Sequence, residues 1–369
     1  MKIITIGGAT TDIFIQTKHT SELNFATSYE QRSFLLFEEG SKIDANTLHF
    51  HTGGGATNSA VSFKKLDFDV TTFFKVGDDK PSEFIMQRLA DIGINTQYIK
   101  QSDEYITGHS FIFPSKSGDR TVLSYRGANA HLHESEIPQV IKQFGNVYIT
   151  SLSGDSAHML LPITRLAKMH SGLVATNPGT SQLTSGTQTM YESLPNIDIF
   201  ILNSDEACSF MLSMIEQDIE LHQKILNTKV TQRDETLPEL LQAPISYQTV
   251  YFDIRLFFEQ VLSRGPKIVV VTNGAEGVYV ATQDGIIFHP SLPTKIVNTL
   301  GAGDAFGSCF VAKYIEGANI KEAMLYGIIN ASSVISHLDA KSGLLTNHEL
   351  EKRFEHVDKD SFQEFDLNV

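Results

Sequence analysis

Short apolar runs alternate with helical patterns along most of the chain. Residues 2–8 form an apolar run that ends in glycines, and residues 70–79 are rich in β-branched and aromatic side chains. Between and after them, residues 59–68 and 81–94 carry apolar positions at helical spacing. Runs of valine, isoleucine and threonine separated by helical segments are typical of βα units. We therefore predict an α/β fold with a mostly parallel sheet covered on both faces.

Two regions depart from this alternation. Residues 108–129 contain two β-rich arms around a Ser-Lys-Ser-Gly-Asp turn, which predicts a hairpin. Residues 213–263 are polar and helix-prone, and they are too many for a short connection. We expect this second region to be an inserted, largely helical elaboration.

Composition narrows the class of partner. The chain has 369 residues and a formal net charge of −14, which argues against nucleic acid or an anionic membrane surface as a partner. No apolar run approaches the ~18 residues of a membrane-spanning helix, and the N-terminus reads as a first strand rather than a signal peptide. We therefore expect a cytoplasmic protein. Cys208 and Cys309 cannot form a disulfide framework, and we interpret both as buried thiols.

Polar residues and glycines follow several of the predicted strands. In an open α/β sheet, ligands bind outside the carboxyl ends of the strands, so these positions are candidates for one shared site. Taken alone, "TNGAEG" is typical of a hairpin turn and "NSDE" of a helix N-cap. The strand-end residues are Asp12, Asn203, Glu206, Thr272, Gly274 and Gly277.

The stretch "TGGGATNSA" is a glycine cluster at the start of a predicted helix. Gly53, Gly54 and Gly55 allow a ligand to reach the backbone, and Asn58 offers both hydrogen-bond donors and an acceptor. Neutral polar groups beside bare amides suit sugar hydroxyls better than a phosphate tail. The alternative interpretation is a tight strand-to-helix turn with no ligand.

A second cluster, "NTLGAGDAFGSCF", places small residues directly before a carboxylate. Gly301, Ala302 and Gly303 precede Asp304, and an apolar run then begins. Backbone amides at a helix N-terminus attract anions, and glycine lets phosphate oxygens come close. The stretch therefore predicts a backbone cradle for a phosphate with an acid at its edge.

Together these motifs resemble the ribokinase-like, or PfkB, family of carbohydrate and nucleoside kinases. The resemblance rests on "GGGATNSA", "VGDD", "NSDE", "TNGAEG" and "NTLGAGDAFGSCF" in the family's order, and it covers residues 3–350. It implies a three-layer α/β/α kinase domain over residues 1–350, with a small β-strand lid from 14–50 and 105–128. Residues 351–369 are then a C-terminal tail.

The resemblance also implies an activity and roles for residues. The expected reaction is transfer of the γ-phosphoryl group of ATP to a hydroxyl of a sugar or nucleoside, without the G-x-x-x-x-G-K-[ST] motif of P-loop enzymes. The anion hole is the backbone of Gly301, Ala302 and Gly303, and Asp304 is the general base. The residues expected to bind the acceptor are Asp12, Gly53, Gly54, Gly55 and Asn58. Those expected at the nucleotide are Asn203, Glu206, Thr272, Gly274, Gly277 and Asn330, with Glu206 reaching Mg²⁺ through water.

Departures from the family pattern leave some properties open. Gly55 stands where ribokinases proper carry a lysine, so nucleosides, fructose-type sugars and sugar phosphates all remain candidate acceptors. Asn298 stands where ribokinases often have an aspartate near a monovalent-cation site, so K⁺ dependence is open as well. We interpret the histidine pairs as surface or lid residues rather than a transition-metal site. These pairs are His49 with His51 and His131 with His133.

Two further hypotheses concern activity and assembly. One alternative is a catalytically inactive ribokinase-like protein that serves as a binding or regulatory module. A Rossmann-type dehydrogenase is weaker, because no strand ends in G-x-G-x-x-G. The lid segments, including residues 32–43, are rich in phenylalanine, leucine and isoleucine. Projecting strands with such side chains need a cover, so we predict a homodimer joined through the lids.

Overall fold

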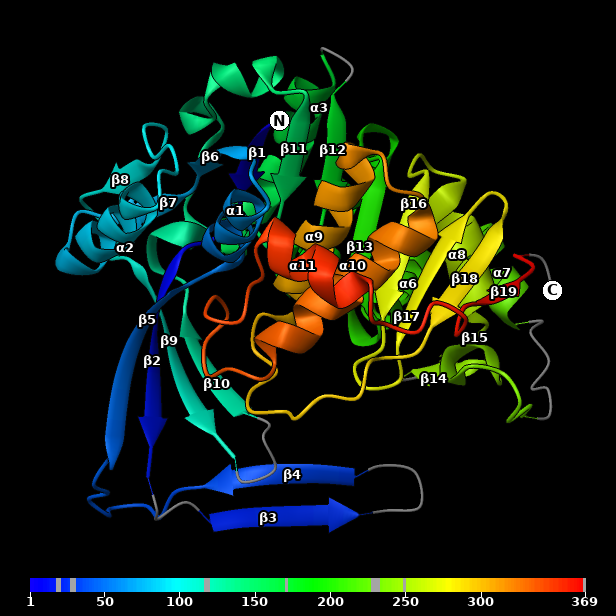
Figure 1. Cartoon of the computed structure of the whole chain (residues 1–369), viewed down its shortest axis with the longest axis horizontal. Coiled ribbons are helices and arrows are strands. Elements are labelled where there is room, and N and C mark those ends of the chain that lie inside the picture. Colours follow the sequence, from blue (N-terminus) through cyan, green and yellow to red (C-terminus); the bar gives the residue numbers. More distant parts are fainter. Residues whose placement is uncertain are drawn as a thin grey trace.

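The structure is a computed structural model, and it describes residues 1–17, 21–26, 31–115, 120–169, 172–226, 233–247 and 250–367. A large sheet lies between layers of helices and forms the body of the molecule (Figure 1). A smaller sheet projects from one side of this body, and a separate hairpin extends from it beneath the body (Figure 1). Over the described ranges, no helix is both long and apolar enough to cross a membrane.

The central sheet has nine strands in the order β19-β18-β17-β16-β13-β12-β11-β1-β6. Neighbouring strands from β6 to β16 pair in parallel, whereas β17, β18 and β19 continue the sheet in antiparallel pairing. The bounds are β1 Lys2–Ile6, β6 Asp69–Phe73, β11 Asn146–Ile149, β12 Leu173–Thr176, β13 Ile199–Asn203, β16 Ile268–Thr272, β17 Val278–Thr282, β18 Gly285–His289 and β19 Gln363–Phe365. The predicted α/β class with a mostly parallel sheet is confirmed.

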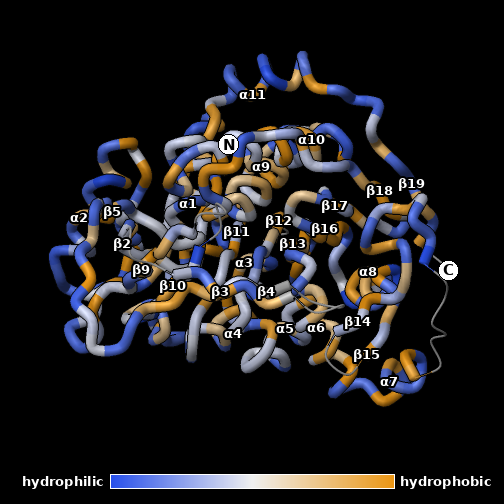
Figure 2. Tube along the Cα trace, turned by 90° about the horizontal axis from the view of Figure 1, so that it is seen from below, coloured by the Kyte–Doolittle hydropathy of each residue, from blue (hydrophilic) through white to orange (hydrophobic). Residues whose placement is uncertain are grey.

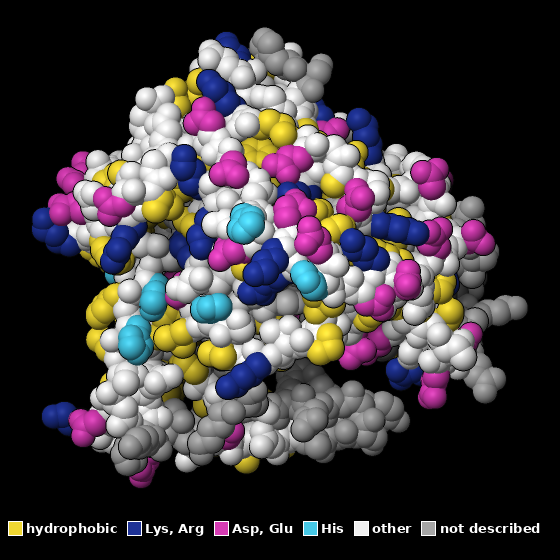
Figure 3. Space-filling view, in the orientation of Figure 1, with side chains coloured by type: hydrophobic (Ala, Val, Ile, Leu, Met, Phe, Trp, Pro, Cys, Tyr) yellow, Lys and Arg dark blue, Asp and Glu magenta, His cyan; other side chains and the backbone are white. Residues whose placement is uncertain are grey.

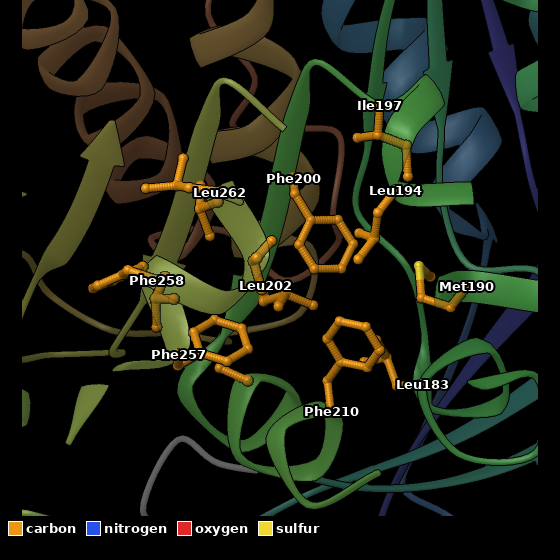
Figure 4. Packing of buried hydrophobic residues seen from close by; sticks show 14 of the residues in the cluster. Leu183, Met190, Leu194, Ile197, Phe200, Leu202, Phe210, Phe257, Phe258 and Leu262 are labelled. Atoms are coloured by element: carbon orange, nitrogen blue, oxygen red, sulfur yellow. The ribbon is translucent and has the colours of Figure 1, made fainter. Parts of the chain in front are cut away.

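Helices cover both faces of this sheet, and each face has its own hydrophobic cluster. On one face, Phe200 and Leu202 of β13 pack with Phe210 and Phe257 from two covering helices (Figure 4). The helices are α1 Gly55–Lys65, α2 Lys80–Asp91, α3 Leu160–Lys168, α4 Thr180–Leu183, α5 Thr187–Ser193, α6 Ser204–Gln217, α7 Ile219–Leu226, α8 Ile254–Leu262, α9 Ala302–Glu316, α10 Ile320–Val334 and α11 Asn347–Phe354. Because both faces of the parallel strands are buried, these strands read as continuous apolar runs in the sequence.

The projecting sheet has four strands in the order β10-β9-β2-β5. Its members are β2 Thr10–Gln16, β5 Thr47–Gly53, β9 Gly108–Pro114 and β10 Arg120–Tyr125. The β9–β10 pair is the predicted hairpin, although most of its turn, residues 116–119, lies outside the described residues. Strands β3 Ser21–Ala26 and β4 Gln31–Leu36 form the separate hairpin (Figure 1). We call the four-stranded sheet the lid sheet and the β3–β4 pair the lid hairpin. A further small sheet pairs β7 Lys75–Gly77 with β8 Lys100–Ser102.

Two segments differ from the sequence-based expectation. Residues 213–263 include a two-stranded sheet, β14 Ile245–Tyr247 with β15 Val250–Phe252, and their last helix, α8, is part of the core rather than an addition to it. Residues 351–369, expected as a tail, complete α11 and add β19 as the edge strand of the central sheet. Figure 2 shows α11 as a largely hydrophilic helix at the outside of the molecule. Strands of three residues are too short to give a readable alternation, which is why the pattern missed them.

Candidate active site

The predicted phosphate cradle is the N-terminus of α9. Gly301 precedes the helix in the left-handed conformation, with φ of 79°, and a Cβ there would lie 2.3 Å from the Cβ of Ala340. Glycine is therefore required at this position. A Cβ on Gly303 would meet nothing within 4 Å. Within the described residues, the amides of Gly303 and Asp304 have no hydrogen-bond acceptor, so two unpaired donors lie at the positive end of the helix dipole.

Asp304 is joined directly to the N-terminal glycine cluster. Nδ2 of Asn58 on α1 donates to Oδ2 of Asp304 at 2.8 Å. One turn further along both helices, Ser308 donates to Oγ of Ser62 at 2.7 Å. Oδ1 of Asn58 is buried and, among the described residues, has no hydrogen-bond partner. The two motifs thus meet in one site, and an unused acceptor atom lies beside the carboxylate.

Asp12 lies on β2 at the base of the lid sheet and is buried. Its carboxylate accepts hydrogen bonds from Thr10, at 2.8 Å, and from the Ser110 side chain. A Cβ on Gly53 would lie 2.0 Å from Oδ2 of Asp12, so the bare backbone of β5 makes room for this carboxylate. Asp12 is close enough to Asp304 for the two charges to interact.

The next two glycines are required by close backbone packing. Gly54 has φ of 91°, and a Cβ there would lie 2.4 Å from the carbonyl oxygen of Gly8. A Cβ on Gly55 would lie 2.6 Å from Oγ1 of Thr150. No side chain fits at Gly55, which explains physically why a lysine cannot stand there.

A lysine nevertheless reaches the site from the other end of the chain. Lys341 lies in the loop after α10, and its Nζ donates to the carbonyl oxygen of Thr52, to Oγ1 of Thr52 at 3.1 Å and to Oγ1 of Thr57 at 2.9 Å. Burial lowers the pKa of Lys341 to about 8, while Asp12, Asp339 and Asp304 oppose that shift. The sequence reasoning missed this residue, because "LDAKSG" has the composition of an ordinary turn. The only indirect sign in the sequence that a lysine reaches the site from elsewhere was the glycine at position 55, where ribokinases carry a lysine.

The two site carboxylates have pKa values above the ordinary range. Burial raises the pKa of Asp304, and the Asn58 hydrogen bond and the Lys341 charge oppose the rise. Burial likewise raises the pKa of Asp12, against the hydrogen bond from Thr10 and the charge of Lys341. A carboxylate whose pKa is raised is a stronger proton acceptor when ionised.

A cavity of about 470 Å³ adjoins the cradle. It brings together the β16–β17 turn and the first turn of α9, two of the predicted regions. The "TNGAEG" stretch is a hairpin turn, as its composition alone indicated, and it also lines this cavity. The predicted residues among the lining are Thr272, Gly274, Gly277, Ala302 and Gly303. The rest of the wall is mostly apolar and comes from residues 291–299 and from α10.

Asn203 and Glu206 form a reciprocal cap on α6. The Asn203 side chain accepts from the amide of Glu206 at 2.8 Å, and the Glu206 carboxylate accepts from the amide of Asn203 at 2.9 Å. The N-cap interpretation of "NSDE" is thus confirmed. Burial, together with the charges of Asp304 and Asp205, raises the pKa of Glu206 to about 7. A cation beside this carboxylate would relieve the crowding of negative charge, so the residues fit a divalent ion.

Asn330 is not part of the cavity wall. It is buried, its Nδ2 donates to the carbonyl oxygen of Ala305 at 3.0 Å, and its Oδ1 accepts from the amide of Leu345 at 3.0 Å. Both ends of the side chain therefore hold α10 to its neighbours. The α10 residues that do face the cavity are Ile328, Ala331 and Ser332, joined by Ile335 directly after the helix. The structure therefore gives Asn330 a structural role, and a role at the nucleotide stays a prediction.

The histidine pairs do not form a metal centre. The rings of His49 and His51 lie 6.4 Å apart between centroids, and His51 contacts the Asp339 carboxylate at 3.6 Å. His131 stacks on Tyr105 at 3.7 Å. Among the described residues, no group of three or more potential ligands is arranged to hold a metal. Figure 3 shows histidines spread over this face of the molecule, with two of them next to each other at the left.

Comparison with known proteins identifies the family of the chain. Residues 21–237 and 253–347 match the pfkB family of carbohydrate kinases. The chain is 25% identical over 320 residues to the ribokinase of Haemophilus influenzae, covering 86% of this chain and 92% of that protein. It is also 25% identical over 304 residues to a bifunctional ribokinase/ribose-5-phosphate isomerase A of Fructilactobacillus sanfranciscensis, of which it spans 48%.

Solved structures have the same fold. The Arabidopsis thaliana ribokinase complexed with ribose and ATP superposes with a TM-score of 0.72 at 19% identity, over 96% of this chain and 98% of that one. The Thermotoga maritima ribokinase gives a TM-score of 0.71 at 20% identity, over 97% of this chain and 100% of that one. With the family match extending over most of its length, the chain belongs to the PfkB family of carbohydrate kinases, which are phosphotransferases with an alcohol group as acceptor.

Proposed function

We propose that this kinase transfers the γ-phosphoryl group of ATP to a hydroxyl of a sugar or nucleoside, with Asp304 as the general base. The observation that carries the proposal is the hydrogen bond from Asn58 to Asp304 beside two unpaired helix amides. It brings a proton acceptor, an anion-stabilising cradle and a hydroxyl-binding side chain within one small volume.

In the proposed reaction, Asp304 accepts the proton of the acceptor hydroxyl as its oxygen attacks the γ-phosphorus. The bond between that phosphorus and the bridging oxygen breaks, and ADP leaves. Charge develops on the phosphoryl oxygens, and the amides of Gly303 and Asp304 are donors fixed in advance for it. Positioning and charge stabilisation are the main requirements of this transition state, so little further covalent help is needed.

Acceptor binding is assigned to Asp12 and Asn58. An ionised carboxylate accepts two hydroxyl hydrogen bonds, and Asp12 has oxygen lone pairs left after Thr10 and Ser110 are counted. Oδ1 of Asn58 is a buried acceptor with no partner among the described residues, which a donating hydroxyl would satisfy. The lid sheet, on which Asp12 lies, would exclude water from competing as acceptor.

The nucleotide is assigned to the cavity between the β16–β17 turn and α10. Its apolar wall suits a base, and it ends at Gly303, where the phosphates would reach the cradle. Mg²⁺ neutralises phosphate charge when bound, and Glu206 would hold it through water. The proposal places the protein in the cytoplasm, where ATP is available.

We also propose that the protein is a homodimer through its lids. On one face of the lid sheet, register pairs Phe50 with Ile13, Ile13 with Phe111 and Phe111 with Leu123. Phe50 is 56% and Leu123 59% exposed, whereas Phe14 on the opposite face is buried. The lid hairpin adds exposed apolar residues that share one of its faces, namely Leu23, Phe25, Phe34 and Leu36. Exposed apolar surface of this extent is usually buried against another surface, and the lid of a second copy of the chain offers a matching apolar face.

The proposed reaction is tested by ADP release from MgATP. The panel contains D-ribose, 2-deoxy-D-ribose, D-fructose, adenosine, inosine and D-fructose 6-phosphate, and mass spectrometry locates the new phosphate. We expect at least one neutral acceptor to raise ADP release well above the rate without acceptor. Folded protein that binds ATP yet phosphorylates nothing in an extended panel would contradict the proposal and favour a binding module.

A further inference from the structure

Lys341 is held so that no donor remains for a substrate. An ammonium group has three N–H donors. All three find acceptors here, in the carbonyl oxygen and Oγ1 of Thr52 and in Oγ1 of Thr57. These bonds fix the loop after α10 against the end of β5 and the first turn of α1. Lys341 therefore acts on its surroundings through its charge and its position, not by binding the acceptor itself.

Negative charge surrounds this ammonium group. The carboxylates of Asp12, Asp339 and Asp304 all interact with it, and they come from β2, from its own loop and from α9. His51 on β5 contacts the Asp339 carboxylate at 3.6 Å, and any positive charge on its ring also acts on Asp12. Asp12 also acts on Asp304, and Asp304 in turn acts on Tyr148 of β11 and Glu206 of α6; none of these groups carries positive charge. Among the described residues, Lys341 is thus the cation that acts on both carboxylates of the acceptor pocket.

Without such a cation, the pocket would favour protonated carboxyls. Asp12 and Asp304 are both partly or fully buried and repel each other, and both effects penalise the ionised forms. A protonated Asp304 cannot take a proton from a hydroxyl. The positive charge of Lys341 favours the ionised form of both Asp12 and Asp304.

We propose that Lys341 is a positioning residue that keeps Asp304 ionised while leaving Asp12 and Asn58 free to bind the acceptor. The inference rests on the proposed role of Asp304 as base. It also accounts for how the site works with glycine at position 55, where a Cβ would collide with Thr150. The required positive charge enters from the C-terminal loop, where there is space for a long side chain.

Lys65 provides a matched control. Its Nζ donates to the carbonyl oxygen of Leu344 at 2.6 Å, so it also fastens the loop after α10, but from outside the acceptor pocket. Lys341→Met and Lys65→Met each remove one ammonium group that holds the same loop, with three hydrogen bonds lost at Lys341 and one at Lys65. Only Lys341→Met removes charge from beside Asp304.

The test follows the side-chain carbon of Asp304 by NMR in protein labelled with [γ-¹³C]aspartate, with Asp304→Asn to assign the signal. We expect Lys341→Met to raise the titration midpoint of Asp304 by roughly one pH unit or more, and Lys65→Met to leave it unchanged. An equal midpoint in Lys341→Met and wild type would overturn the inference. So would an equal shift in both variants, because the loop and not the charge would then be responsible.

The wild-type protein supplies a second measurement should Lys341→Met fail to fold. Since the pKa of Lys341 is about 8, the Asp304 signal should show a second, smaller step near that pH as the ammonium group loses its proton. The pH of this step is fixed independently by following the side-chain ε-carbon of Lys341 in labelled protein, and an Asp304 signal that does not respond when Lys341 loses its proton would contradict the inference. Neither measurement needs an acceptor, so the result stands whether or not the substrate panel succeeds.

Discussion

Asn58 and Asp304 are 246 positions apart in the sequence, and a 2.8 Å hydrogen bond joins their side chains. Each stands in the first turn of a helix that a glycine stretch precedes, α1 for Asn58 and α9 for Asp304. The bond orients the carboxylate, and it leaves Oδ1 of Asn58 available beside it. An acceptor hydroxyl held by Asn58 would therefore lie close to the atom that takes its proton, which is the positioning that phosphoryl transfer requires.

Asp12→Asn should weaken acceptor binding while leaving ATP binding unchanged. The amide has one acceptor oxygen in place of two and no charge, and each charged hydrogen bond lost is worth roughly 1.5–3 kcal/mol. We expect the acceptor KM to rise by at least ~10-fold. Asp78→Asn, which changes an exposed carboxylate outside the site, is the matched control and should behave as wild type. Calorimetry that finds unchanged acceptor affinity in Asp12→Asn would place the pocket elsewhere.

Two glycine substitutions separate folding from phosphate binding. Gly301→Ala should destabilise the protein by about 1–3 kcal/mol, because the residue has positive φ and its Cβ would meet Ala340. Gly303→Ala should leave the melting temperature unchanged, since its Cβ meets nothing, yet raise the KM for ATP by narrowing the cradle. Thermal melts and ADP-release kinetics measure both effects. A wild-type KM for ATP in Gly303→Ala would show that the N-terminus of α9 does not bind the phosphates.

Glu206→Gln should raise the Mg²⁺ concentration needed for half-maximal activity several-fold. The substitution keeps an acceptor oxygen for the cap on Asn203 but removes the charge that attracts the ion. Glu216→Gln, on an exposed carboxylate near the other end of α6, is the control. Identical Mg²⁺ titrations for Glu206→Gln and wild type would exclude Glu206 from holding the metal.

Phe34→Asp should convert the proposed dimer into monomers. Phe34 is 43% exposed on the apolar face of the lid hairpin, where it packs edge-on against Phe25. Ser33→Asp places the same charge on the opposite face of the same strand and should leave the dimer intact. Light scattering distinguishes the variants. Wild-type protein that stays monomeric and fully active at micromolar concentration would end the lid-dimer hypothesis.

The sequence predicted the sheet because apolar runs alternate with helical patterns, and the candidate site residues were chosen from signals at strand ends. Parallel strands bring their carboxyl ends to one edge, so Asn203 and Thr272, which pair at the ends of β13 and β16, could be placed together without knowing the packing. Asp12 lies instead on β2 of the lid sheet, beyond the end of β1. The glycine clusters could be recognised in the sequence because close backbone packing and positive φ favour glycine, as at Gly301 and Gly54.

Other features left no readable mark. Helix α10 is buried on most sides, so its pattern does not reveal which residues face the cavity, nor that both ends of the Asn330 side chain bond to neighbouring segments. Lys341 depends on tertiary packing alone, since nothing near it in the sequence distinguishes it from a surface lysine. Strand β19 has three residues, which is too few for periodicity.

The central claim is that Asp304 is the base, and Asp304→Asn tests it most directly. The amide keeps the size of the side chain but cannot accept the hydroxyl proton, and general-base catalysis is typically worth ~10²–10⁴ in rate. Single-turnover kinetics with an acceptor from the panel, combined with calorimetry of ATP and acceptor binding, separate chemistry from binding. The account predicts a kcat reduced at least ~10²-fold with both affinities nearly unchanged. A kcat near that of wild type with the same acceptor would contradict it.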